Sequence, residues 1–168
     1  MTVRAAVVLV GFMLVAGGLS NCVSRKTAPV TAEPGKNLRL VTRSYTVFGK
    51  RYVPMGAQAA LKYKAEGIAS CYDDYGSRGA YGEILRKGEF YAAHTTLPMP
   101  CRVRITNLSN GKSCEARVID RGPFTANRLI DVSYAVAGEL GFLGKGLQRV
   151  RVEVVSVGDG PGQLKAED

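Results

Sequence analysis

Short segments in which polar and apolar side chains alternate constrain the fold of this chain more than any other feature. Residues 102–106, 114–118 and 148–155 alternate with a period of two, the pattern of a strand with one buried and one exposed face. Residues 45–48, 51–53 and 67–72 indicate further short strands, the first two forming a small hairpin around Gly49 and Lys50 or a single bent strand that ends at Pro54. Such strands, separated by turn residues, predict a closed all-β barrel or a sandwich.

One segment predicts a helix. Residues 134–140 have helical character, with Ser133 or Asp131 as the N-cap and Gly141 directly after the end. The length of 168 residues corresponds to about one domain and excludes a two-domain enzyme. The expected fold class is therefore all-β, or more fully mainly β with one short helix.

The first 21 residues have the pattern of an export signal. Arg4 is their only charge, and residues 5–19 contain no charged or strongly polar side chain, which suits a signal peptide and is too short to span a bilayer. Leu-Ser-Asn-Cys at 19–22 resembles a bacterial lipobox, so residues 1–21 are expected to be a lipoprotein signal peptide and Cys22 the lipid anchor. Cleavage after a small residue such as Gly18, or an uncleaved anchor, is the alternative. Because Val23 follows in place of an Asp, we expect a lipid-anchored, periplasm-facing protein, with the outer membrane favoured.

The net charge of +9 is concentrated before the barrel. Residues 22–66 hold nine Lys or Arg against two Glu, whereas residues 67–157 hold twelve basic and nine acidic residues. We expect a basic flexible tether at 22–44 that lies against anionic lipid or wall polymers, followed by a pre-barrel segment at 45–66. Nucleic-acid binding is not expected, because the chain lacks a pattern of aromatic and basic residues that could stack on bases.

Three further cysteines leave the disulfide pairing open. An exported chain enters an oxidising compartment, yet Cys71, Cys101 and Cys114 can form at most one internal bridge, and all three can equally be buried thiols. An Asn-Gly pair at 110–111 predicts a two-residue hairpin turn, which would place Cys114 opposite Asn107. Cys101 and Cys114 are then not direct cross-strand neighbours.

Three polar residues lie where turns are expected. Asp120 begins Asp-Arg-Gly-Pro-Phe at 120–124 directly after an apolar strand, Glu83 follows a Gly-rich stretch, and His94 is the one histidine. Taken singly, each is more often a turn or structural residue than a catalyst. A single His, and four Cys without C-x-x-C spacing, exclude a multi-His metal site and a zinc ribbon. We therefore expect chemistry based mainly on carboxylates, with no metal and no other cofactor.

The order and spacing of these residues and their surroundings resemble the rare lipoprotein A family. The matching motifs are Gly-Ile-Ala-Ser at 67–70, Gly-Glu at 82–83, Ala-Ala-His at 92–94, Thr-Leu-Pro at 96–98, Val-Arg-Ile-Thr-Asn-Leu at 103–108, Asn-Gly-Lys-Ser at 110–113, Asp-Arg-Gly-Pro-Phe at 120–124 and Arg-Leu-Ile-Asp-Val-Ser at 128–133. The resemblance covers residues 67–157 and implies a six-stranded double-psi β-barrel there. Residues 158–168 are expected to be a flexible tail, without the C-terminal peptidoglycan-binding repeat domain that many members carry.

The resemblance implies an endolytic peptidoglycan lytic transglycosylase that acts on naked glycan strands, free of stem peptides. Such an enzyme cleaves the bond from N-acetylmuramic acid (MurNAc) to N-acetylglucosamine (GlcNAc) and leaves 1,6-anhydroMurNAc ends. The catalytic positions of the family fall on Asp120, Glu83 and His94. Asp120 is expected to protonate the leaving oxygen and then to deprotonate the C6 hydroxyl. Glu83 is the candidate for a nearby carboxylate that keeps it protonated, and His94 suits an orienting role.

One departure from the family favours a second hypothesis. The family usually reads Ala-Ser-Trp-Tyr-Gly where this chain has Ala-Ser-Cys-Tyr-Asp at 69–73, so that Cys71 replaces a ring that could stack on a sugar. We expect Tyr72, Thr96 and Arg121 to bind the substrate, and Arg121 to oppose protonation of Asp120 unless its side chain points elsewhere. The alternative is a non-catalytic lipoprotein barrel that binds peptidoglycan glycan or a cell-division protein.

Overall fold

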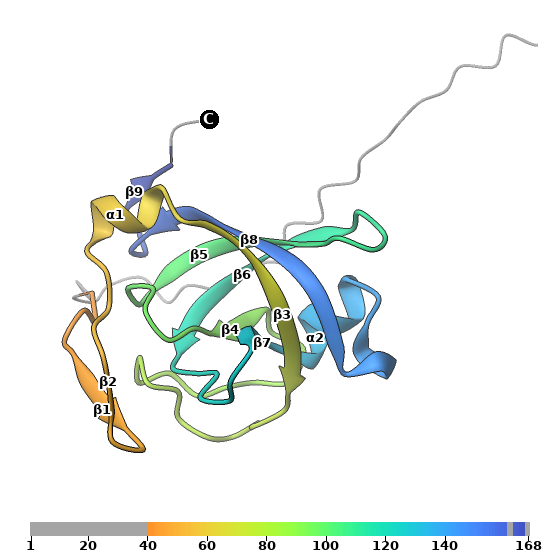
Figure 1. Ribbon diagram of the computed structural model, residues 1–168, viewed down its shortest axis with the longest axis horizontal. Helices are drawn as coiled ribbons and strands as arrows, with labels where there is room; N and C mark the ends of the chain where they lie inside the picture. Colours follow the sequence, from red (N-terminus) through yellow and green to blue (C-terminus); the bar gives the residue numbers. More distant parts are fainter. Residues whose placement is uncertain (1–39, 161–162, 167–168) are drawn as a thin grey trace, which may run out of the picture.

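Six strands close into a barrel in the computed structural model, which describes residues 40–160 and 163–166 (Figure 1). Neighbouring strands follow the order β3-β7-β4-β6-β5-β8, and a pairing of β3 with β8 completes the circle. The strands are β3 (Lys64–Tyr72), β4 (Tyr91–Ala93), β5 (Cys101–Asn107), β6 (Ser113–Asp120), β7 (Arg128–Ser133) and β8 (Leu147–Val157). The predicted mainly β fold and six-stranded barrel are confirmed, and β3 begins three residues before the expected start of the barrel at 67.

The barrel mixes parallel and antiparallel pairs. β3 runs parallel to β7 and β4 runs parallel to β6, whereas the other pairs of the barrel are antiparallel. The short strand β4 lies between β6 and β7, although it precedes both in the sequence. This arrangement brings the ends of three strands together at one side of the barrel.

Apolar side chains on alternate positions fill the barrel interior. The strands β5 and β8 bury every second residue, as their period of two predicts. Their fully buried side chains are small and mostly β-branched, a size that suits the interior of a small barrel: Val103, Ile105, Val150 and Val152.

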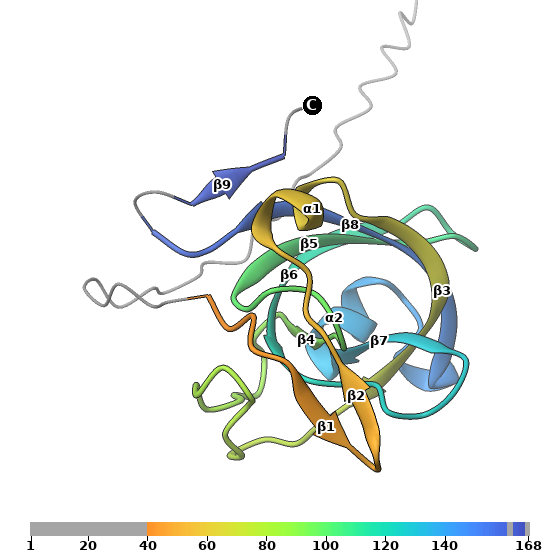
Figure 2. The same cartoon turned by 60° about the vertical axis from the view of Figure 1, so that its left-hand side comes forward.

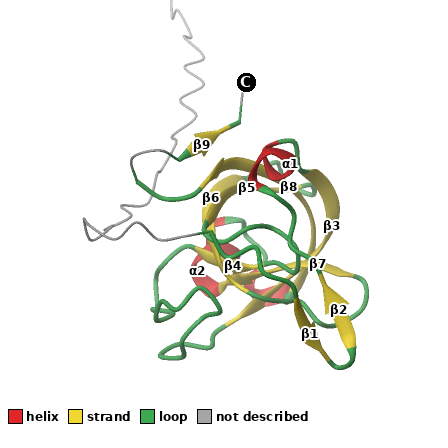
Figure 3. Ribbon diagram, turned by 90° about the vertical axis from the view of Figure 1, so that its left-hand side faces the viewer, coloured by secondary structure: helices red, strands yellow, loops and turns green. Residues whose placement is uncertain are grey.

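Helix α2 (Tyr134–Glu139) packs on the barrel through Val136 and Ala137 (Figure 3). The Ser133 hydroxyl accepts a hydrogen bond from the backbone N–H of Val136, so Ser133 is the N-cap, and Gly141 follows the end with a φ of +76°. The predicted helix is therefore confirmed. A second short helix, α1 (Ala57–Leu61), and a single 3-10 turn, η1 (Leu143–Lys145), were not predicted.

A separate hairpin stands beside the barrel (Figure 2). Its strands β1 (Tyr45–Val47) and β2 (Lys50–Tyr52) pair in an antiparallel register, with Phe48 and Gly49 in the turn at φ values of 50° and 75°. A two-residue turn with both φ values positive matches the twist of the flanking strands. The predicted hairpin is confirmed, but its turn lies one residue earlier than the expected Gly49 and Lys50.

The turn between β5 and β6 differs from the prediction. Cys114 pairs with Ile105 and not with Asn107, because the chain makes a longer turn in which the Asn107 N–H donates to the Lys112 carbonyl. The buried Asn107 side chain also accepts a hydrogen bond from the Ser109 N–H, which stabilises the longer turn.

The three described cysteines are unpaired in the structure. Cys101 pairs with Val118 across the sheet, so it does not face Cys114, as expected. Burial raises the pKa of both the Cys101 and the Cys114 thiol to about 12. Of the alternatives left open by the sequence, the structure has the one in which the thiols are free, with Cys71 half-buried.

The expected flanking segments are described only in part. The predicted signal peptide, the anchor Cys22 and nearly all of the predicted tether lie outside the described residues. Within the expected tail, strand β9 (Leu164–Lys165) pairs with the end of β8, so that part is ordered. No helix in the described part of the chain is long and apolar enough to cross a membrane.

Shortening a core side chain tests the barrel packing. Ile105 is fully buried, so Ile105→Ala is expected to lower the free energy of unfolding by about 2–5 kcal/mol through lost burial and a cavity. Leu147→Ala is the control, because that side chain is 56% exposed and its loss should have little effect. Urea unfolding followed by circular dichroism measures both, and equal losses would contradict the packing described.

Candidate active site

Asp120 stands at the end of β6, and two backbone groups orient its carboxyl group. Its Oδ1 atom accepts hydrogen bonds of 2.8 Å from the N–H groups of Ala80 and Arg121. Among the described residues, no hydrogen bond engages its Oδ2 atom. One oxygen is therefore fixed by the protein, and the other is available to a substrate.

Gly79 allows the loop at 76–83 to lie directly against Asp120. A Cβ atom at Gly79 would come within 2.9 Å of the Ile119 carbonyl oxygen and 3.6 Å of the Asp120 Cβ atom. The Tyr81 N–H donates to the same carbonyl at 3.0 Å. A side chain at position 79 would push this loop, and with it the Ala80 N–H donor, away from Asp120.

A second carboxyl group, that of Asp131, lies near Asp120. Ala93 at the end of β4 pairs with Asp120 on one side and with Asp131 of β7 on the other. Two strand spacings place the two Cα atoms about 10 Å apart. The turn that follows Asp120 also passes over Asp131, because a Cβ atom at Gly122 would lie 3.8 Å from the Asp131 Oδ2 atom.

The surroundings of Asp131 favour its protonated form. Burial raises the pKa of this carboxyl group, the Ser70 hydroxyl bond and the Arg128 charge lower it, and the Asp120 charge raises it, with a net increase. Ser70 donates to Oδ1 at 2.5 Å, and Arg128 lies 3.4 Å from Oδ2. From the sequence, Asp131 is expected as a helix cap and not as a site residue. Its position between the apolar Ile130 and Val132 is the signal in the sequence for an unusual carboxyl group.

The Tyr72 hydroxyl also lies in this region and has no hydrogen-bond partner among the described residues. Burial raises the pKa of Tyr72, and the charges of Asp120 and Asp131 add to the increase. A buried hydroxyl without a partner is costly, so such a group usually has a partner in the working state of the protein. Tyr72 therefore has a hydroxyl donor that the described residues leave unused.

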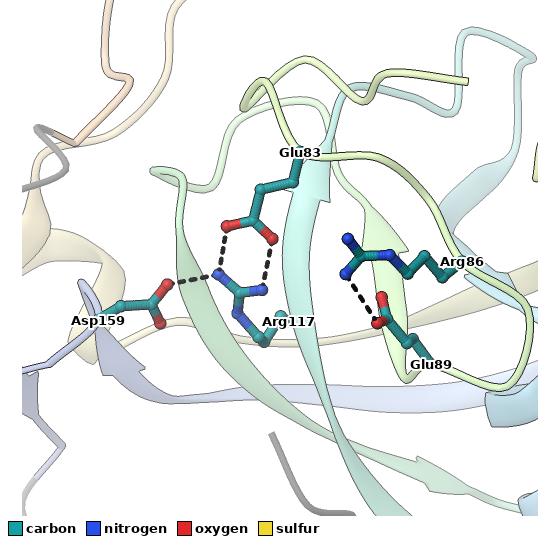
Figure 4. A network of polar contacts seen from close by, with 5 residues as sticks. All are labelled: Glu83, Arg86, Glu89, Arg117 and Asp159. Carbon is teal, nitrogen blue, oxygen red and sulfur yellow. Dashed lines mark hydrogen bonds and ion pairs between the residues drawn. The ribbon is translucent and has the colours of Figure 1, made fainter. Parts of the chain in front are cut away.

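Glu83 does not pair with Asp120. Both of its carboxylate oxygens accept hydrogen bonds from Arg117, at 2.7 and 2.9 Å, and Arg117 also binds Asp159 at 2.5 Å (Figure 4). Burial favours a lower Arg117 pKa, but the bonds to the two carboxylates raise it above its ordinary value. The Arg86–Glu89 pair in the same view is a separate contact. Glu83 therefore anchors the loop whose Ala80 N–H orients Asp120.

His94 is buried and holds the turn that follows it. Its Nδ1 atom accepts hydrogen bonds from the N–H groups of Thr96 and Leu97, at 3.1 and 3.0 Å. Nδ1 therefore carries no proton, and the neutral ring donates from Nε2 to the Tyr63 hydroxyl at 3.0 Å. Burial, and next the charge of Arg121, lower the pKa of His94 to about 4. The ring is suited to orienting a loop and not to transferring protons near neutral pH.

The side chain of Arg121 points to backbone carbonyls and not to the carboxyl group beside it. It donates to the carbonyl oxygens of Val41, His94 and Leu97, at 3.0, 3.1 and 2.6 Å. These bonds give Arg121 a structural role, and its expected contact with the substrate stays a prediction. Thr96 is half-exposed, and its N–H and carbonyl groups already bind His94 and Met55.

The structure thus brings some of the expected residues together and separates others. Asp120 and Tyr72 share one environment with the unexpected Asp131, whereas Glu83 and His94 support the loops on either side. No group of three His, Cys, Asp or Glu side chains within 40–160 and 163–166 is arranged to hold a metal ion.

The buried His94 predicts a loss of stability in mild acid. Its pKa is about 6.5 in an unfolded chain and about 4 in the fold, so the unfolded chain binds the proton first. The contribution of the neutral His94 to the free energy of unfolding is complete above pH 6.5. It falls by about 3 kcal/mol as the pH drops to 4. His94→Asn keeps an acceptor near the Nδ1 position and removes the titration. Urea midpoints at several pH values should fall more steeply in the wild type, and parallel curves would contradict a buried neutral His94.

Known proteins are similar to this barrel in sequence. A family model described as lytic transglycolase matches residues 64–152. The chain is 40% identical over 149 residues to the endolytic peptidoglycan transglycosylase RlpA of Neisseria meningitidis serogroup B. This alignment covers 88% of this chain and 62% of that protein. It is 49% identical over 111 residues to RlpA of Pseudomonas aeruginosa strain PAO1, covering 65% of this chain and 32% of that protein.

Among solved structures, the Streptomyces papain inhibitor aligns with a TM-score of 0.47 and 24% identity over 55% of this chain and 94% of that chain. The chain spans less than two thirds of the length of the curated relatives named above. The matched segment contains Asp120, Asp131 and Glu83 together with most of the barrel. From the match over residues 64–152, this chain belongs to the lytic transglycolase family.

Proposed function

We propose that this protein is an endolytic peptidoglycan lytic transglycosylase that acts on naked glycan strands. It cleaves the bond from MurNAc to GlcNAc and leaves a 1,6-anhydroMurNAc end. The observation that carries the proposal is the oriented Asp120 carboxyl group with Asp131 beside it at one side of the barrel. Membership of the family supports it, as does the similarity to the endolytic peptidoglycan transglycosylases of Neisseria and Pseudomonas.

Asp120 serves first as the acid and then as the base. Its protonated carboxyl group donates to the glycosidic oxygen as the bond to the MurNAc C1 atom breaks, and GlcNAc leaves as an alcohol. The resulting carboxylate then takes the proton of the MurNAc C6 hydroxyl as that oxygen bonds to C1. The proton lost in the first step is regained in the second, so no water is consumed.

Asp131 takes the place of the neighbouring carboxyl group that was expected from the sequence to be Glu83. The pKa of the half-buried Asp131 is raised, first by burial and to a smaller extent by the Asp120 charge, so the two carboxyl groups are electrostatically coupled. Arg121 makes no side-chain hydrogen bond to Asp120, because its guanidinium binds three carbonyl groups, although the two charges attract each other.

Other residues position the reacting groups. The ion pair of Glu83 with Arg117 holds the loop that supplies the Ala80 N–H to Asp120. His94 holds the turn on the opposite side. A contact of the buried Tyr72 hydroxyl with the sugar requires the side chains that cover it to move. Such positioning explains why the site can require polar groups that never exchange protons with the substrate.

The cellular setting follows from the substrate. Peptidoglycan is outside the cytoplasmic membrane, so the enzyme works in the cell envelope. We propose that Cys22, which lies outside the described residues, anchors the chain to a membrane through lipid, facing the periplasm, with the outer membrane favoured by Val23.

A non-catalytic glycan-binding barrel is the second candidate, and a binder of a cell-division protein is its variant. The observation that favours it is the position of Cys71, where the thiol stands in place of an aromatic ring. The two candidates differ in their products, since only an enzyme creates anhydro ends.

Removing the acid tests the proposed chemistry. Asp120→Asn keeps an oxygen that can accept the Ala80 N–H, so the site should stay folded while proton transfer is lost. The yield of anhydromuramyl products from denuded strands, measured by mass spectrometry, should fall about 100-fold or more. Glu115→Gln, which removes a carboxylate that pairs with Arg104 away from the site, is the control. An unchanged yield for Asp120→Asn would remove Asp120 from this role.

The role of Asp131 has its own test. Asp131→Asn keeps an acceptor for the Ser70 hydroxyl but removes the second ionisable group. Because the reaction needs a protonated acid, its rate falls as the pH rises, and removing the coupled ionisable neighbour should move this fall to lower pH. The pH dependence of kcat/KM measures the shift. A lower rate with an unmoved profile would make Asp131 purely structural.

A further inference from the structure

Three aromatic rings lie together beside the turn that follows Asp120. The rings of Tyr45 and Tyr52 on the hairpin stack with centroids 5.2 Å apart and an angle of 14° between their planes. Phe124, which ends the turn, meets both rings edge-on, at 6.4 and 5.6 Å. Phe124 is 37% exposed, so the cluster reaches the surface only four residues from the proposed acid.

The hairpin is attached at this end of the barrel by several contacts. The Tyr45 hydroxyl donates to the Thr95 carbonyl at 2.8 Å, and the guanidinium of Arg121 lies 5.3 Å from the centre of the Tyr45 ring. Just after the hairpin in the sequence, the Met55 N–H donates to the Thr96 carbonyl at 2.8 Å. The hairpin therefore has a defined position next to the catalytic turn, although it belongs to a separate two-stranded sheet.

The hairpin and the chain around it are basic. Residues 40–56 contain Arg43, Lys50 and Arg51 and no acidic residue, and all three cations are exposed. The Lys50 ammonium group lies 5.2 Å from the centre of the Tyr52 ring. Lys50 is thus presented beside the aromatic cluster, whereas Arg51 lies on the other face of the hairpin, where it donates to the Ser44 hydroxyl.

We propose that the β1–β2 hairpin, together with Phe124, is a binding arm for glycan strands that carry free lactyl carboxylates. The exposed part of the aromatic cluster contacts the C–H faces of the sugars, and Lys50 beside it binds the carboxylate that each MurNAc exposes once its stem peptide is removed. Arg51 adds positive charge from the other face of the hairpin. This inference rests on the proposed function and explains a preference for naked strands, because an attached peptide converts the same carboxyl group into an uncharged amide.

The arrangement favours a glycan over a membrane surface as the occupant. The stacked rings are half-buried and contact Phe124, which ends the turn that begins at Asp120, so they lie next to the proposed acid and not at a remote surface. Within residues 40–56 the large apolar side chains that stand far out are Phe48, at 91% exposure, and Val53, at 63%, which is little area for insertion into lipid.

Binding measured without turnover tests the arm. The full chain carrying Asp120→Asn is titrated with denuded glycan strands and, separately, with neutral GlcNAc oligomers, which have the same backbone linkage and no lactyl group. Lys50→Glu with Arg51→Glu should weaken binding of denuded strands about tenfold or more and leave binding of the neutral oligomers unchanged. Added salt should weaken binding of denuded strands more in the parent than in this variant.

Two further variants separate the contributions of rings and charge. Phe124→Ala should weaken binding of both ligands, because it removes apolar surface that either sugar chain contacts. Lys112→Glu with Lys145→Glu is the matched charge reversal, placed on the turn between β5 and β6 and on η1, across the barrel from the hairpin (Figure 1). It should retain the affinity of the parent. Circular dichroism and urea midpoints identify a variant that has lost its fold, in which case Lys50→Gln with Arg51→Gln replaces the charge reversal.

Three results would overturn the proposal. The first is unchanged affinity of the hairpin variants for denuded strands, and the second is equal weakening for neutral oligomers on charge reversal. The third is that the hairpin variants lose binding to phosphatidylglycerol vesicles but keep their affinity for glycan, which would assign the hairpin to a membrane surface. The proposed function fails differently, through anhydro products that persist in Asp120→Asn, and that result leaves these binding measurements valid.

Discussion

The backbone pairing of β4 with two partners is the interaction on which the site depends. This strand has only three residues, yet it bonds to β6 on one side and to β7 on the other, so that Asp120 and Asp131 flank Ala93. Their separation is determined by sheet geometry, which varies little, and not by the loops that follow each strand. A barrel with a rigid wall can therefore hold two carboxyl groups at a constant spacing while the loops around them change.

A second layer of contacts joins the loops to this wall. The guanidinium of Arg121 binds carbonyl groups from the turn after His94 and from Val41, and the His94 ring binds the N–H groups of the same turn. On the other side, Glu83 holds its loop through Arg117. Each contact satisfies a buried polar group, so these residues stabilise the site by their hydrogen bonds and need not meet the substrate.

The sequence was sufficient for the elements whose patterns are local. Alternation located β5, β6 and β8, because each has one face in the barrel interior, whereas β4 is buried throughout and shows no alternation. The register of the β5–β6 turn was wrong because Asn107 stabilises a longer turn. Asp131 and Glu83 were misjudged because their partners, Ser70 and Arg117, are far away in the sequence, and no local pattern shows which polar groups will meet.

The bond from Arg121 to the Val41 carbonyl has a consequence for where this domain begins. The family match starts at residue 64, but one of the carbonyl groups that accept hydrogen bonds from the Arg121 guanidinium belongs to Val41, more than twenty positions earlier. A fragment cut at the start of the barrel would leave a half-buried cation short of an acceptor, and would lose the ring that lies against it. The smallest cooperative unit of this protein is therefore larger than its barrel, and the segment before β3 is one of its structural parts.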